Sequence, residues 1–350
     1  MVKIVKLLLY PFAVLYDLVT RIRNHLYDIR QKPSFQFDRE IIVVGNLNVG
    51  GSGKTPMIEY IVRLLKDQFL IATLSRGYKR QTKGFRIAQS TDSARSIGDE
   101  PFQLFRKFGS QVNVTVGEDR VFAIPFILQE FPETDAILLD DAFQHRSVRP
   151  HLSILVTDYA HPFYNDFLMP MGYLREARSG AKRADVIVVT KCDESLSNDR
   201  KISISNEIKN YADSKPVFFS AIRYVEPVQA GNQIIVEKNI VLVSGIANTT
   251  QFEEFCKSNY TVIKHFNYSD HHSYSVHDLN EIELFCKSQS QPISIVTTEK
   301  DYVKFLLPDL KHFLDRLPWF YLPIEQYFLE DGAKFDALIL RSVRNVLSTE

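Results

Sequence analysis

Short apolar runs, each bounded by polar or turn-forming residues, recur through the first two thirds of the chain. Continuous apolar runs of this length are typical of buried parallel strands, because helices cover both faces of such a sheet. Several intervening segments, such as 57–66 and 101–108, carry apolar residues at helical spacing. The alternation predicts a doubly wound α/β fold. The expected strands are residues 41–44, 71–74, 112–116, 136–139, 153–156 and 186–189.

A second block of the same kind begins near residue 239. A strand-like segment at 239–245 is followed by a helical segment at 250–259 and by a further strand pattern at 293–298. Polar loop residues replace the strand pattern between the two blocks. We therefore expect a large domain over residues 33–225 and a smaller C-terminal α/β domain over residues 226–350.

The N-terminal segment, residues 1–32, has an apolar first half, and its second half is basic. The apolar stretch at 7–16 is broken by Pro11 and closed by Asp17, well short of the roughly 20 apolar residues that a spanning helix needs. No small-residue cleavage site follows it. The pattern predicts an amphipathic helix on a membrane surface, although a helix packed on the protein's own core would show the same periodicity. The basic residues are Arg21, Arg23, Arg30 and Lys32.

Composition narrows the class of protein. Hydrophobic residues make up 45% and charged residues 24% of the chain, as in ordinary globular proteins. Lys plus Arg and Asp plus Glu both number 42, so no overall positive charge favours nucleic acid as a partner. Three scattered cysteines, Cys192, Cys256 and Cys286, are too few for a disulfide framework. We expect a cytosolic location and no nucleic-acid partner.

A glycine-rich loop, GNLNVGGSGKTP at residues 45–56, follows the first predicted strand and leads into a helix. In this context backbone N–H groups of 50–55 surround phosphate oxygens at a helix N-terminus, while Lys54 neutralises the phosphates and Thr55 holds Mg²⁺. Asn48 stands where the usual pattern begins with glycine, and Asn tolerates positive φ. The expected nucleotide contacts are Asn48, Val49, Gly50, Gly51, Ser52, Gly53, Lys54 and Thr55.

Two carboxylates stand where the predicted strand at 136–139 ends, in AILLDDAFQH. Enzymes with this loop hold Mg²⁺ from two sides, through the loop hydroxyl and a strand-end carboxylate. We therefore expect Mg²⁺ at Thr55 with Asp140 or Asp141, and the choice between the two stays open. His145 and His151 stand apart from other ligands and do not indicate zinc.

These motifs, together with LSRGYKR, IGDEP, LDDAFQHR, GYLREA, VVTKCD, NYSDHHSYS and TTEKD, resemble the lipid A 4'-kinase family. The likeness spans nearly the whole chain and includes the amphipathic start. It implies an enzyme that transfers the γ-phosphate of ATP to the 4'-hydroxyl of a tetraacylated glucosamine disaccharide 1-phosphate. The implied product is lipid IVA, formed at the cytoplasmic face of the inner membrane.

The resemblance also implies a catalytic pair, since the family uses the Asp of its GDEP segment with a His from its DH segment. These are Asp99 and His271 here, acting beside Lys54. A positioned carboxylate can take the proton of a sugar hydroxyl as the hydroxyl becomes acidic during transfer. Without the resemblance, Asp99 fits a helix cap before Pro101, and His271 fits a surface histidine. Further candidates for substrate contact are Arg76, Arg120 and Glu176.

Two basic loops could meet anionic headgroups, although such charge runs are also typical of solvated faces. They contain Arg76, Lys79, Arg80, Lys83 and Arg86, and Arg175, Arg178, Lys182 and Arg183.

Two other functions compete with the kinase. TKCD at 190–193 is similar to the element with which GTPases recognise guanine, but Thr stands where Asn is expected and no clear switch sequence is present. A nucleotide-binding scaffold without chemistry is the second alternative. The retained phosphate-loop lysine and metal ligands argue against it.

Overall fold

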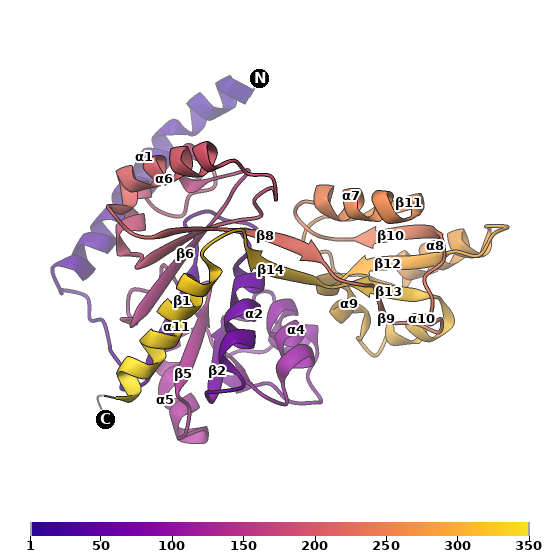
Figure 1. Cartoon of the computed structure of the whole chain (residues 1–350), viewed down its shortest axis with the longest axis horizontal. Helices are drawn as coiled ribbons and strands as arrows, with labels where there is room; N and C mark the ends of the chain where they lie inside the picture. The colour runs from indigo at the N-terminus through magenta and orange to yellow at the C-terminus, as the bar shows by residue number, and fades with distance from the viewer. Residues whose placement is uncertain (1, 349–350) are drawn as a thin grey trace.

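The computed structural model describes residues 2–348, with side chains from residue 8 onward, and its two α/β lobes lie side by side (Figure 1). Residues 1 and 349–350, which the predicted segments 1–32 and 226–350 include, lie outside the described residues. The sheet of the large lobe runs in the order β14 (Ile324–Phe328), β8 (Val217–Tyr224), β7 (Val186–Thr190), β6 (Leu152–Asp158), β1 (Glu40–Gly45), β5 (Ala136–Asp140), β2 (Ile71–Ser75), β4 (Asn113–Val116) and β3 (Arg86–Ile87). The predicted doubly wound α/β fold is confirmed.

Helices cover both faces of the large sheet because successive buried residues of each strand point to opposite sides. Ile42 and Val44 of β1 face one core, and Ile41 and Val43 face another. The first face packs against α2 (Lys54–Leu65), α4 (Asp99–Phe108) and α11 (Gly332–Leu347). The opposite face packs against α5 (Arg120–Glu130) and α6 (Asn198–Ala212). Short helices α3 (Ala94–Ile97), η1 (Phe163–Asn165) and η2 (Arg178–Arg183) lie in the connections.

The small lobe contains a five-stranded sheet with helices on both faces. Its order is β11 (Thr261–Asn267), β10 (Asn239–Ser244), β12 (Ser294–Thr298), β13 (Trp319–Leu322) and β9 (Val228–Gln229). One face packs against α7 (Thr250–Asn259), and the other packs against α8 (Val276–Lys287), α9 (Glu299–Phe305) and α10 (Lys311–Arg316). The second predicted α/β unit is therefore present.

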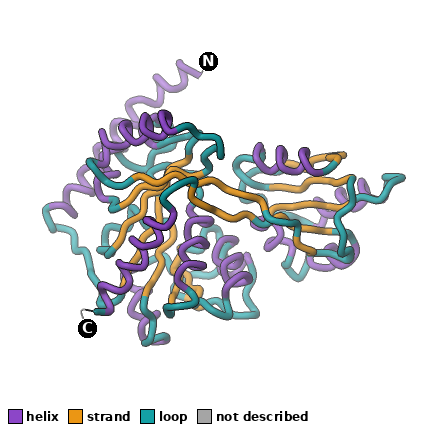
Figure 2. The backbone as a smooth tube through the Cα atoms, viewed as in Figure 1, coloured by secondary structure: helices purple, strands orange, loops and turns teal. Residues whose placement is uncertain are grey.

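The chain returns to the large lobe after it completes the small one. Strand β14 pairs antiparallel with β8, and the two run between the lobes (Figure 2). Phe335, Ile339 and Val343 of α11 then join the core that contains Met57 of α2. The predicted small domain, 226–350, wrongly places β14 and α11 in the small lobe. An antiparallel edge strand gives a weaker apolar pattern than a buried parallel one, so the sequence pattern does not reveal which sheet it joins.

Helix α1 (Val2–Asp28) lies at the edge of the large lobe, away from the small lobe (Figure 1). Its polar residues hold it there: Asn24 Nδ2 donates to Glu176 Oε2 at 2.7 Å, and Arg23 donates to the Gln144 carbonyl at 2.8 Å. Its apolar side chains face outward, since Leu8 is 68% and Phe12 is 64% exposed. The described helices include none with the length and apolar character to span a membrane.

Candidate active site

The glycine-rich loop lies between β1 and α2, where the predicted phosphate site requires it. Gly50 and Gly53 adopt positive φ values of 114° and 84°, which glycine adopts without strain. A Cβ atom on Gly53 would lie 3.1 Å from Thr190 Cβ. The Thr190 hydroxyl donates to the Ser52 carbonyl at 2.8 Å, so the last residue of β7 holds the loop by a hydrogen bond.

Asn48 plays a different part from the one that the sequence predicts. Its backbone does not take positive φ but forms an isolated antiparallel bridge with Leu174. Its side chain donates to Asp166 Oδ2 at 2.7 Å, and the neighbouring Val49 N–H donates to the Tyr173 carbonyl at 2.7 Å. An amide at position 48 thus ties the start of the phosphate loop to residues 166–174, which a glycine could not do.

Lys54 opens α2 and points back over the loop. Its Nζ lies 3.3 Å from Asn46 Oδ1, 3.5 Å from the Gly50 carbonyl and 3.6 Å from Asp141 Oδ1. Thr55 follows it in the first turn of the helix. The ammonium group therefore lies among three oxygen atoms of the loop and of Asp141, and a phosphate would compete with them for its hydrogens.

Asp140 and Asp141 differ in environment although they are adjacent. Asp140 ends β5, and its Oδ1 atom is buried without a hydrogen-bond partner among the described residues. Burial, with the negative charge of Asp141, raises the pKa of Asp140 to about 7. Burial also acts on Asp141, but Lys54 and Arg175 outweigh it and hold the pKa of Asp141 below its usual range. Arg175 donates to both Asp141 oxygens at 2.9 and 3.0 Å.

The buried, unpartnered oxygen of Asp140 suits a divalent cation. A buried carboxylate is costly unless a positive partner compensates it, and oxygen ligands are those that Mg²⁺ prefers. Asp141 is already paired with two cationic side chains. Of the two aspartates, Asp140 thus has the oxygen available. Within residues 8–348, three or more His, Cys, Asp or Glu side chains do not converge on one cation site.

Asp99 and His271 come together from the two lobes, 172 residues apart in the chain. Asp99 lies in the first turn of α4, and His271 lies between β11 and α8 with a left-handed φ of 55°. Their closest atoms, Asp99 Oδ2 and His271 Nδ1, are 3.4 Å apart, and both side chains are 20% exposed. The Tyr78 ring packs edge-on against the imidazole at 5.4 Å. The pair is therefore partly buried but still open to a ligand.

The predicted substrate residues lie at different depths. Arg120 is only 1% exposed; it donates to the Gly117 carbonyl at 2.5 Å and to the Asp140 carbonyl at 3.2 Å. Burial lowers the pKa of Arg120 to about 10. Glu176 is 2% exposed and accepts two hydrogen bonds from Arg183. Both side chains are therefore buried and occupied by partners within the chain, whereas Arg76, which directly follows β2, is exposed.

Most residues of the two basic loops are engaged within the chain. The ion pairs are Arg80 with Glu118, Arg86 with Asp92, Arg175 with Asp141, Lys182 with Asp213 and Arg183 with Glu176.

Lys191 is a residue of the site that the sequence analysis did not select. Its Nζ donates to the Gly51 carbonyl and, at 2.8 Å, to Asp158 Oδ2. It follows β7 and has a left-handed φ of 55°. The sequence signal for this lysine is the TKCD segment at 190–193, which is similar to a guanine-recognition element.

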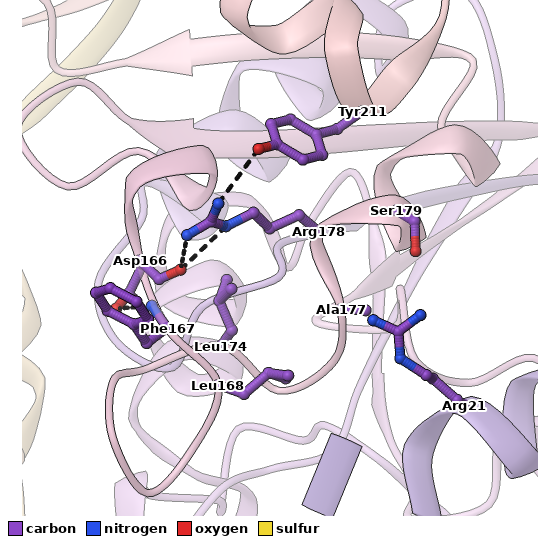
Figure 3. Close-up of a pocket in the computed structure, with 9 residues that line it drawn as sticks. All are labelled: Arg21, Asp166, Phe167, Leu168, Leu174, Ala177, Arg178, Ser179 and Tyr211. Atoms are coloured by element: carbon purple, nitrogen blue, oxygen red, sulfur yellow. Dashed lines mark hydrogen bonds between the residues drawn. The ribbon is translucent and has the colours of Figure 1, made fainter. Parts of the chain in front are cut away.

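A cavity of about 340 Å³ lies beside residues 166–179 (Figure 3). Arg178 crosses it, donating to the Asp166 carbonyl at 2.8 Å and to the Tyr211 hydroxyl at 3.2 Å. Arg21 of α1 lines its other side. Because Asp166 also binds Asn48, the cavity connects α1 with the start of the phosphate loop.

The chain is similar to known proteins over nearly its whole length. The model of the family described as tetraacyldisaccharide-1-P 4'-kinase matches residues 5–344. A tetraacyldisaccharide 4'-kinase of Flavobacterium johnsoniae is 41% identical over 345 residues, which are 97% of this chain and 98% of that protein. One of Parabacteroides distasonis is 40% identical, over 96% of this chain and 94% of that protein. A crystal structure of LpxK from Aquifex aeolicus in complex with ATP superposes with a TM-score of 0.76 at 28% identity, covering 97% of this chain and 99% of that one. With a family match over nearly its whole length, this chain belongs to the tetraacyldisaccharide-1-P 4'-kinase family.

Proposed function

We propose that this chain transfers the γ-phosphate of ATP to the 4'-hydroxyl of a tetraacylated glucosamine disaccharide 1-phosphate, with Asp99 as the proton acceptor. As a member of its family, the chain is a kinase of lipid A biosynthesis. Family membership favours this activity over the GTPase and scaffold alternatives. The observation that carries the residue assignment is the contact between Asp99 and His271 across the two lobes.

The nucleotide site supports ATP as the phosphate donor. A relative with the same fold binds ATP, and here the loop at 50–55 and Lys54 provide backbone N–H groups and a cation for the phosphates. Thr55 and Asp140 would hold Mg²⁺, which when bound neutralises phosphate charge. Asp141 would stay with Lys54 and Arg175 and keep both cations directed at the nucleotide.

Asp99 is suited to accept the proton of the sugar hydroxyl. It lies in the first turn of α4, beside Glu100, whose charge helps to raise the pKa of Asp140. His271 would orient the Asp99 carboxylate through Nδ1, leaving the other oxygen for the substrate. Phosphoryl transfer depends mainly on positioning and charge neutralisation, so a fixed acceptor is the part that the protein must supply.

The lipid substrate and helix α1 favour a peripheral position at the cytoplasmic face of the inner membrane. The outward apolar side chains of α1 would enter the lipid, and the cavity beside Arg21 would receive part of the substrate headgroup. Changing Leu8, Phe12 and Leu15 together to Gln should lower partition into phospholipid vesicles by at least roughly 10³-fold, because each buried apolar side chain contributes about 1.5–3 kcal/mol. The matched control makes the same changes at three other exposed apolar residues, Leu70, Ile202 and Leu284. Equal partition of the two triple variants would refute membrane binding by α1.

Transfer of label from γ-labelled ATP to a detergent-solubilised disaccharide 1-phosphate tests the reaction. Lys54→Ala should abolish transfer, and Asp99→Asn should lower kcat roughly 10²–10⁴-fold while the KM for ATP changes little. Asp315→Asn, at an exposed position of α10, is the matched control. Wild-type turnover in Asp99→Asn would eliminate Asp99 as the proton acceptor.

A further inference from the structure

Lys300 lies beside the catalytic pair and has no role in the function described so far. It belongs to the TTEKD segment and occupies the first turn of α9 in the small lobe. Its Nζ atom is 3.1 Å from His271 Nε2, 3.4 Å from Glu100 Oε1 and 3.6 Å from Asp270 Oδ1. Only 25% of its side chain is exposed. The ammonium group thus lies behind the imidazole, on the side opposite Asp99.

The chemistry of the two groups determines the direction of the contact between them. An ammonium group carries three donors and no acceptor, whereas a neutral imidazole has one donor nitrogen and one acceptor nitrogen. A lysine that donates to Nε2 therefore requires the lone pair on Nε2 and the hydrogen on Nδ1. That hydrogen faces Asp99 Oδ2. In the opposite tautomer, the hydrogen on Nε2 would face the Lys300 ammonium group, which is also a donor. The lone pair on Nδ1 would then face the Asp99 carboxylate.

We propose that Lys300 is a positioning residue for phosphoryl transfer, which holds His271 in the tautomer with hydrogen on Nδ1 so that the ring donates to Asp99. The proposal rests on the proposed roles of Asp99 and His271. It assigns the lysine of TTEKD to the same site as the aspartate of GDEP and the histidine of the DH segment.

The surroundings of Lys300 keep it charged. Burial lowers its pKa, but the carboxylates of Glu100, Asp270 and Asp99 outweigh burial and raise the pKa above its usual range. Lys300 therefore remains a donor throughout the pH range in which the enzyme would be assayed. Lys304, one turn later, cannot replace it, because its Nζ donates to Asp301 at 2.9 Å. Of the Asp99–His271 pair, Lys304 approaches the carboxylate of Asp99, at 3.9 Å, and not the imidazole.

Loss of Lys300 would change the protonation of the ring. Nε2 of His271 lies 3.9 Å from both Glu100 and Asp270, so a ring without the lysine could take a second proton and point it at these carboxylates. A doubly protonated ring beside Asp99 would stabilise the Asp99 anion and make it a poorer proton acceptor. The defect should therefore grow as the pH falls. The groups that face the ring are Asp99, Glu100, Asp270, Lys300 and Tyr78.

The test combines kinetics with NMR of the full-length protein labelled with ¹⁵N-histidine. Long-range ¹H–¹⁵N correlations distinguish a protonated ring nitrogen from one with a lone pair, and His271→Gln identifies the signals. In the wild type, His271 should show a protonated Nδ1 and an unprotonated Nε2. In Lys300→Met the two nitrogens should become alike, through tautomer exchange or double protonation. Lys287→Met, on the exposed side of α8, is the matched control and should leave both signals in place.

The kinetic expectation is a loss in kcat of about 10- to 100-fold for Lys300→Met, part of the roughly 10²–10⁴-fold that a positioned acid or base contributes. The KM for ATP should stay near its wild-type value, and the loss should be larger at pH 6 than at pH 8. Lys300→Arg keeps a donor and should recover part of the rate and the wild-type ring signals.

Two results would overturn the assignment of Lys300: wild-type kcat in Lys300→Met, or unchanged His271 ring signals in that variant. A failure of the proposed function looks different. If His271→Gln turns over like the wild type, the catalytic pair itself is wrong, whatever the ring signals show. If His271→Gln is slow and Lys300→Met is not, only the positioning role is lost.

Discussion

Replacing Asp140 by Asn should stabilise the protein without ligands while it removes the predicted metal ligand. The Asp140 carboxylate is buried, and its Oδ1 atom has no hydrogen-bond partner among the described residues. Asn has nearly the same shape and no charge. The substitution therefore removes the cost of a buried anion and leaves the packing of β5 intact.

The magnitude follows from the raised pKa. Asp140 titrates at about 7 in the folded protein, whereas an ordinary aspartate titrates near pH 4. Between these values the folded state holds a proton that the unfolded chain has released, so the stability of the wild type falls as the pH rises through this window. At pH 8 the full shift of about three pH units, at about 1.4 kcal/mol each, lowers the stability of the wild type by roughly 4 kcal/mol. At pH 5 only a little more than one unit of the shift counts, so the wild type is destabilised by roughly 2 kcal/mol.

Urea unfolding of Asp140→Asn and wild type, at pH 5 and pH 8 without Mg²⁺ or nucleotide, measures this difference. The gain in the free energy of unfolding should be larger at pH 8. Asp141→Asn is the matched control with the opposite sign, because Lys54 and Arg175 lower the pKa of Asp141 and the substitution leaves both cations without that partner. Adding Mg²⁺ and ATP should stabilise the wild type more than Asp140→Asn. A gain that does not depend on pH, or a less stable Asp140→Asn at pH 8, would refute the reasoning.

Two further substitutions test the interface of the lobes and the phosphate loop. Lys107→Met removes a cation that lies 2.8 Å from Glu59 and 2.9 Å from Glu299, and should cost about 3–5 kcal/mol in urea unfolding at pH 8. The loss should shrink at pH 5, because burial and Glu59 raise the pKa of Glu299, and an equal loss at both pH values would contradict this. Gly53→Ala forces a side chain into φ 84° against the end of β7, so ATP affinity should fall roughly 5- to 30-fold, for about 1–2 kcal/mol of strain. Gly84→Ala, with φ 77° and open space around it, should bind ATP as the wild type does.

Much of the large lobe is predictable from sequence because its strands are buried on both faces. Each of the six expected strands overlaps a strand of the sheet, and residues 41–44 fall within β1. The predicted boundary at 225/226 places the edge strand β14 and helix α11 in the small domain, whereas both belong to the large lobe. Their position depends on pairing with β8 and on packing of Phe335 against the distant α2, which no local pattern encodes.

The site divides in the same way. The phosphate loop, Lys54, Asp140 and Asp141 are local motifs, and motif order alone places them together. The role of Asn48 was not predictable, since the hydrogen bond to Asp166 depends on the fold of a loop more than 100 residues later. The meeting of Asp99 and His271 could be inferred only through the family resemblance, because it depends on the arrangement of two lobes.

That arrangement separates two tasks. The phosphate loop, the predicted metal ligand and Asp99, the proposed proton acceptor, all belong to the large lobe. The small lobe supplies His271, which contacts Asp99 of the large lobe. Strands β8 and β14 form the covalent connection, and Lys107 bridges Glu59 of the large lobe to Glu299 of the small one. Glu299 directly precedes Lys300 on α9, so the bridge to Lys107 and the contact with His271 are made by the same turn of that helix. The residue that we propose to fix the His271 tautomer is thus held next to a bridge to the large lobe.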